Sequence, residues 1–140
     1  MLYSRQTRGP VPEVVERLIK AVKDHQFGVL GEIDLRAKMN EKGVPFEHDC
    51  IILEVCNPSQ AKKVLDQNLA ISTSLPCRIS IYEKDGKVTV ATVKPTILLK
   101  MYQDAEDLAP VAKDVENTLI AIINQACQKD PISPSGTVPS

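Results

Sequence analysis

The chain has 140 residues, 43% of them hydrophobic, which is the usual size of one domain with enough apolar material to bury its own core. Its 17 Lys and Arg nearly balance 18 Asp and Glu, so no net field draws it to nucleic acid or to an anionic membrane. Aromatic residues make up only 4% and Trp is absent, which disfavours sites that stack bases or sugar rings.

No targeting signal is evident in the sequence. Residues 1–6 contain no apolar stretch long enough for a signal peptide, and no run approaches the roughly 18 apolar residues of a membrane helix. We therefore expect a cytoplasmic protein with no membrane partner. Its cysteines, Cys50, Cys56, Cys77 and Cys127, form no Cys-x-x-Cys pair, and in a reducing compartment they are expected to be free thiols.

The first third of the chain predicts a strand, a helix and a second strand. Residues 2–7 are short and β-prone and lead into Gly9-Pro10, which suits an edge strand followed by a loop. Residues 12–25 carry apolar side chains at helical spacing, which predicts an amphipathic helix. Residues 29–35 then alternate between the two faces of a half-buried strand.

The middle of the chain predicts a buried strand followed by a helix. The polar segment 36–45 is typical of a loop or a short helical turn, and residues 50–56 form a nearly continuous apolar strand. Asn57 and Pro58 indicate a helix start, because an Asn side chain caps free N–H groups and Pro has no N–H to be orphaned. This helix is expected to end near Asn68 in the left-handed conformation. The residues expected to face inward from it are Ala61, Val64 and Leu65.

A β-hairpin is the clearest local element. Pro76 opens a strand over residues 77–83, the Asp-Gly in residues 84–87 supplies a tight turn, and residues 88–93 complete the antiparallel pair.

A long amphipathic helix follows the apolar stretch 96–102 and is predicted to cover one face of the sheet. Acidic residues at its start and flank, Glu106, Asp107, Asp114 and Glu116, are interpreted as solvated helix surface. Its apolar stripe consists of Leu108, Val111, Ala112, Val115, Leu119, Ile122, Ile123 and Ala126.

These elements predict one α+β domain over residues 1–129. We expect an antiparallel curled sheet of about five strands, in the order β-α-β-β-α-β-β-α, with the long C-terminal helix across one face. Residues 130–140 are rich in Pro and Ser and have no core stripe, so they are predicted to be a disordered tail.

Several motifs, in order along the chain, resemble a known family. They are Leu53-Glu54-Val55-Cys56-Asn57-Pro58 running into Ala61-Lys62, then Leu75-Pro76-Cys77-Arg78 and Lys94-Pro95, together with the early Gly28-Val29-Leu30. Over residues 12–126 the chain resembles the bacterial and archaeal family catalogued as domain of unknown function 302. The resemblance implies a fold similar to the TATA-binding-protein class, with the sheet curled around the terminal helix. It does not imply DNA binding, because function belongs to sites and not to topology, and the family has no settled activity.

Strand alternation predicts which side chains share a face of the sheet. Ile51, Leu53 and Val55 should meet the helices together with Cys77, Ile79 and Ile81. If no bulge reverses the alternation, a mixture of acid, base and thiol gathers on the opposite face. Three interpretations stay open: a solvated face with ion pairs, a dimer interface that uses Cys50 and Ile52, and a small-molecule or metal site. The residues of this predicted face are Glu32, Asp34, His48, Glu54, Cys56, Arg78 and Tyr82.

Cys56 is the sharpest single candidate for chemistry. It precedes the capping Asn57, where the positive end of a helix dipole lowers a thiol pKa, so it could act as a nucleophile, redox sensor or soft-metal ligand. No His is near it in sequence to act as a base, and ordinary packing is the competing interpretation. A disulfide between Cys56 and Cys77 is conceivable, but their predicted opposite faces argue against it.

The leading hypothesis is a non-enzymatic domain that binds a small ligand or associates with itself as a homodimer. The predicted ligand-binding residues are Glu54, Cys56, Arg78, His48 and Tyr82. The alternative is thiol-based redox sensing or soft-metal binding centred on Cys56. A third hypothesis is a hydrolytic or isomerising enzyme that uses Glu54, His48 and Arg78. No phosphate loop, nucleophile elbow, zinc motif or calcium loop is present, so no cofactor and no nucleic-acid partner is expected.

Overall fold

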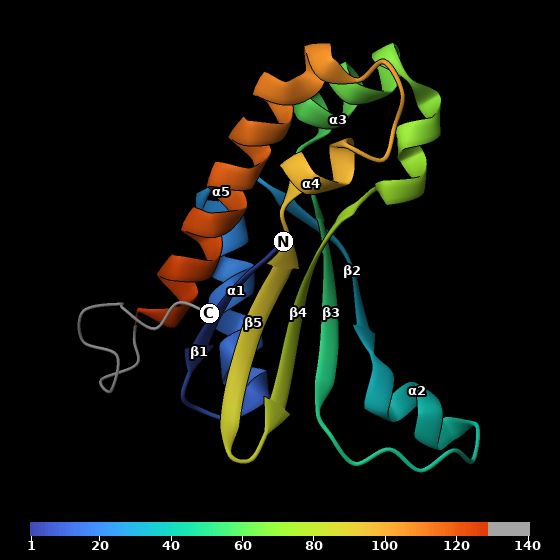
Figure 1. Cartoon of the computed structure of the whole chain (residues 1–140). Helices are drawn as coiled ribbons and strands as arrows, with labels where there is room; N and C mark the ends of the chain where they lie inside the picture. Colours follow the sequence, from blue (N-terminus) through green and yellow to red (C-terminus); the bar gives the residue numbers. More distant parts are fainter. Residues whose placement is uncertain (129–140) are drawn as a thin grey trace.

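The computed structural model describes residues 1–128, which form an antiparallel sheet with helices packed against one face (Figure 1). The strands are β1 (Leu2–Thr7), β2 (Gly28–Asp34), β3 (Cys50–Cys56), β4 (Cys77–Lys84) and β5 (Lys87–Val93). Within the described residues they form one five-stranded sheet in the order β1-β5-β4-β3-β2. The predicted α+β class is confirmed, and β1 is an edge strand as expected. The predicted tail, residues 130–140, lies outside the described residues.

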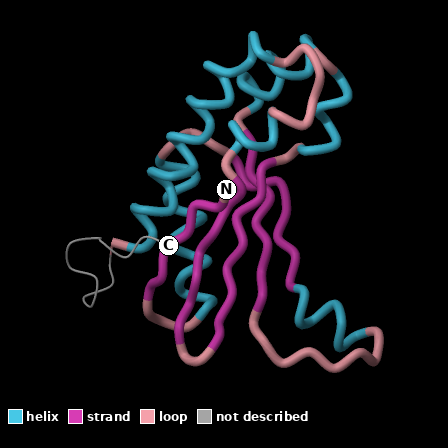
Figure 2. Tube along the Cα trace, viewed as in Figure 1, coloured by secondary structure: helices cyan, strands magenta, loops and turns pink. Residues whose placement is uncertain are grey.

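Apart from the short helix after β2, the helices of the described residues form two groups (Figures 1 and 2). The long helices α1 (Val11–Asp24) and α5 (Ala109–Cys127) lie side by side along the covered face of the sheet. A second group gathers beyond one end of the strands, near the start of α5. It consists of α3 (Pro58–Gln67), the 3-10 helix η1 (Leu69–Ser74), α4 (Pro95–Leu99) and the 3-10 turn η2 (Glu106–Leu108). The short helix α2 (Leu35–Glu41) follows β2 at the other end.

The core lies between the sheet and the two long helices. The inward rows of β3 and β4 are buried as alternation predicts, and Leu53, Val55, Ile79 and Ile81 are all fully buried. Leu18 of α1 and the stripe of α5 pack onto them. Each such side chain contributes about 1.5–3 kcal/mol through removal of apolar area from water. The sheet, α1 and α5 therefore form the stable core of the domain.

Two asparagines begin consecutive helices at the end of β3. The Asn57 side chain accepts a hydrogen bond from the Gln60 backbone N–H at 3.1 Å, which confirms the predicted start of α3. The prediction of a left-handed Asn68 is wrong, because Asn68 has an extended backbone with φ −157°. Its side chain instead accepts from the Ala70 N–H and starts η1.

A β-bulge at Leu30 decides which side chains of β2 share a face with β3. Val29 pairs with Val55, but the next pair is Gly31 with Glu54, so Leu30 is an extra residue. The insertion reverses the alternation, because paired residues in a sheet point to the same side.

Downstream of the bulge Glu32 pairs with the core residue Leu53, and Asp34 pairs with Ile51. The prediction that Glu32 and Asp34 share the face of Glu54 is therefore wrong. Ile33 takes their place on the uncovered face, opposite Ile52.

Glu116 of α5 is buried, which contradicts its interpretation as solvated surface. Only 3% of the residue is exposed. Its carboxylate accepts hydrogen bonds from the backbone N–H and the hydroxyl of Thr96, at 3.2 and 2.6 Å, and from Lys113 Nζ at 3.1 Å. Burial opposes ionisation, but these hydrogen bonds outweigh it and lower the pKa of Glu116. The contact joins the first turn of α4 to α5.

Candidate functional site

An apolar cavity lies where the ends of β3 and β4 meet the second group of helices. Its volume is about 80 Å³. The floor comes from Val55 at the end of β3, and the walls come from α3, α4 and α5. The principal apolar wall residues are Ala61, Val64, Leu98, Leu99, Val111, Ala112 and Val115.

Two of the residues that line the cavity have small side chains. Ala61 on α3 and Ala112 on α5 leave space that larger residues would fill, since protein interiors otherwise pack closely. Neither α3 nor α4 has a fully buried residue, and Val64 and Leu98 stay half-buried. An apolar wall that is only half covered can bury further area when a small apolar molecule enters.

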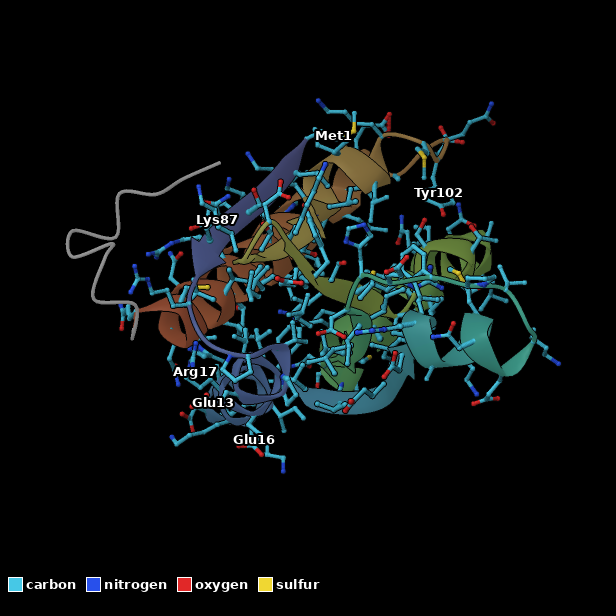
Figure 3. All side chains as sticks on the ribbon, turned by 90° about the horizontal axis from the view of Figure 1, so that it is seen from below. Met1, Glu13, Glu16, Arg17, Lys87 and Tyr102 are labelled. Atoms are coloured by element: carbon cyan, nitrogen blue, oxygen red, sulfur yellow. The ribbon has the colours of Figure 1, made fainter. Side chains whose placement is uncertain are left out.

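Most polar side chains at the cavity are already paired. Asn57 caps α3, as described. The Tyr102 hydroxyl bonds to the Thr73 hydroxyl at 2.6 Å and to the Ser74 hydroxyl, which fastens the segment after α4 to η1. Tyr102 lies on the opposite side of the molecule from Arg17 of α1 (Figure 3).

Gln60 differs from these polar neighbours. Its Oε1 is buried and has no hydrogen-bond partner among residues 1–128, although the side chain borders the cavity. Sequence reasoning missed Gln60, but a signal was available. Gln60 and Val64 stand four positions apart, which places them on one face of α3.

Two cysteines border the same cavity as neutral thiols. Burial raises the pKa of the Cys56 thiol, which is the opposite of the direction expected from the helix dipole. Burial, with a smaller effect of the Cys56 charge, raises the pKa of Cys77 to about 11. Alternation assigned the two residues to opposite faces, but β3 ends at Cys56 and the chain turns into α3. Both cysteines are free.

The other predicted site residues lie on the uncovered face of the sheet and do not form one site. Glu54 and Arg78 are cross-strand partners, with Oε2 and Nε 3.9 Å apart and the Arg78 side chain 64% exposed. Tyr82 pairs instead with Cys50, towards the other end of the strands.

His48 precedes β3, is exposed, and packs edge-on against Phe46 with ring centroids 5.8 Å apart. Six positions separate it from Glu54, about 20 Å along an extended chain. The structure therefore brings Glu54 to Arg78 but does not bring His48 to either of them.

The described residues offer neither a metal-binding cluster nor a membrane-spanning helix. Within residues 1–128 no group of three or more His, Cys, Asp or Glu is arranged to hold a metal ion. Over the same residues, every helix falls short of the length and apolar content that crossing a membrane requires.

A five-stranded antiparallel sheet with helices on one face and an apolar cavity at one end defines a small α+β domain. The chain belongs to the family Domain of unknown function DUF302, whose sequence profile matches residues 3–126. It is similar to an uncharacterized conserved DUF302 protein from Bacillus stearothermophilus, known from a crystal structure. The two share 35% sequence identity and superpose with a TM-score of 0.84, over 89% of this chain and 97% of that chain.

A search of curated proteins finds no match. The resemblance read from the motifs is thus confirmed at the level of the family. The likeness to the TATA-binding-protein class stays a prediction that neither comparison tests.

Proposed function

We propose that this domain binds a small, largely apolar molecule in the cavity between the ends of β3 and β4 and the helices α3, α4 and α5. The observation that carries the proposal is an apolar cavity whose walls are only half-buried. Apolar cavities of about 150 Å³ take up benzene, so a space of about 80 Å³ encloses a short branched group or part of a ring. A larger ligand would extend outward past the half-exposed wall residues.

The side chains near the cavity and on the sheet support ligand binding but not catalysis. Cys56 and Cys77 stay protonated near neutral pH, whereas a thiol nucleophile must be a thiolate. The three residues of the enzyme hypothesis do not converge, because His48 is far from Glu54 and Arg78 along the strand. The thiol-based alternative keeps one supporting observation, namely that Cys56 and Cys77 border the same cavity.

The proposal is tested by titrating toluene into protein with labelled methyl groups and following the methyl NMR signals. We expect saturable shifts at Val55, Val64, Val111 and Val115. Val14 of α1 is fully buried in the main core away from the cavity, and its signal should stay still. Shifts that do not saturate, or that appear instead on the uncovered face, would contradict the assignment of the cavity as the ligand site.

Self-association through the uncovered face of the sheet is a second candidate function. Ile33 and Ile52 are cross-strand partners there, and both are only half-buried. Glu54 and Arg78 stand beside them, so two copies related by a two-fold axis can pair Glu54 of one copy with Arg78 of the other. We propose a homodimer on this basis.

Analytical ultracentrifugation tests the dimer. The native chain should sediment at twice its mass of 15.4 kDa, and Ile52→Asp should reduce it to the monomer. Leu69→Asp is the matched control, because Leu69 is 73% exposed on η1, away from this face. A native chain that is monomeric at every concentration rejects the second candidate and leaves the cavity proposal intact.

A further inference from the structure

This inference rests on the proposed function and concerns the chemistry of the ligand. We infer that the ligand is a neutral molecule with an apolar body and a hydroxyl or amide N–H, which donates a hydrogen bond to Gln60 Oε1. The inference combines the apolar cavity with the unpaired Gln60 oxygen at its wall.

The backbone of Gln60 is fixed at the wall of the cavity. Its N–H donates to the Asn57 side chain in the first turn of α3, which holds the helix start against the end of β3. From this position the side chain shares a helix face with Val64, which also borders the cavity. Because Gln60 is itself a lining residue, a ligand in the cavity lies against it.

The buried oxygen needs a hydrogen-bond donor. Buried carbonyl groups in folded proteins are almost always paired, and an unpaired one is costly. The side chains of Asn57, Ser74 and Tyr102 at the cavity already have partners, so Gln60 Oε1 is the buried acceptor left unmatched in the described chain. A ligand in the cavity that carries a hydrogen-bond donor would pair with Gln60 Oε1.

The ligand should be neutral. No charged side chain is among the described residues that border the cavity, so an ionised ligand would lose its hydration without gaining a partner. A hydroxyl or amide on an apolar body can instead leave water and recover one hydrogen bond. Sites of this kind discriminate strongly against analogues that lack the polar group.

Phenol and toluene test the inference, because a hydroxyl in one replaces a methyl group in the other. The affinities of both are measured by methyl NMR for the native protein and for Gln60→Met, which keeps the length of the side chain but removes the amide. We expect the preference for phenol relative to toluene to fall about tenfold in Gln60→Met. Gln60→Glu keeps an acceptor at this position of α3, where Glu is well tolerated, and should retain the preference.

The outcomes separate the two proposals. If neither phenol nor toluene binds the native protein in the cavity, the proposed function fails. If toluene binds but the ratio of the two affinities is the same in the native protein and in Gln60→Met, only the hydrogen-bond inference is overturned. Urea denaturation of each variant shows that it is folded, and Gln60→Leu, which also lacks the acceptor, takes the place of Gln60→Met should that variant not fold.

Discussion

Filling the cavity should make the protein more stable and abolish binding. Ala112→Leu adds three carbon atoms to an α5 side chain that borders the space. An unfilled cavity costs about 24 cal/mol for each Å³. Filling a volume of about 80 Å³ would therefore raise the free energy of unfolding by up to about 2 kcal/mol.

The control is the same substitution elsewhere on the same helix. Ala126 is 1% exposed and packs in the main core, so Ala126→Leu should lower the free energy of unfolding by about 1–3 kcal/mol through overpacking. Urea denaturation followed by circular dichroism measures both variants, and a toluene titration measures binding. Ala112→Leu should lose toluene binding.

Two results would refute this reasoning. If Ala112→Leu destabilises the protein as much as Ala126→Leu, the space beside Ala112 is not available to a side chain. If Ala112→Leu stabilises the protein but toluene binds with unchanged affinity, the ligand site lies elsewhere.

Three further predictions concern thiols, a buried carboxylate and the bulge. At pH 7 iodoacetamide should label Cys56 and Cys77 more slowly than it labels free cysteine, and the labelling rate of Cys77 should rise only near pH 11. Site-resolved mass spectrometry measures both rates, and fast labelling of Cys56 at pH 7 would restore the thiol alternative. Glu116→Gln should lower the free energy of unfolding, measured by urea denaturation at pH 7, by about 1–3 kcal/mol. Because the pKa of Glu116 in the folded protein lies below 4.5, the difference between native protein and variant should shrink as the pH falls through that pKa. A difference that does not depend on pH would contradict this prediction. At Gly31 a Cβ would lie 2.7 Å from Glu54 Oε1, so Gly31→Ala must displace the end of the Glu54 side chain. Its effect on the free energy of unfolding should therefore be less favourable in the native protein than in a Glu54→Ala background, and equal effects in the two backgrounds would show that the carboxylate is not the obstacle.

Local signals in the sequence predicted the elements that local interactions determine. The strand over residues 50–56, the Asn57 cap and the hairpin closed by Asp85 and Gly86 follow from side chains a few positions apart. In that turn both residues have positive φ, 54° and 78°, as the Asp-Gly pair predicts. The long C-terminal helix was predicted from its apolar stripe, and the resemblance to the family implied that the sheet curls around it.

Features that depend on distant partners were not visible in the sequence. The bulge at Leu30 is set by the pairing of β2 with β3, so alternation alone misplaced Glu32. Glu116 is buried because Thr96, twenty positions earlier, supplies two donors. The cavity could not be predicted, since its lining comes from segments far apart along the chain and depends on how they pack against one another.

The position of the cavity gives the domain two regions of different local stability. α3 and α4 contain no fully buried residue, whereas β3, β4 and α5 share the main core. Helices with few buried contacts open and close more readily than the core of the same protein. A ligand held between them would slow hydrogen exchange in α3 and α4 first and leave the exchange of the inner strands nearly unchanged. Ligand binding would then make the α3 and α4 end of the molecule more rigid, while the sheet and the long helices keep their structure.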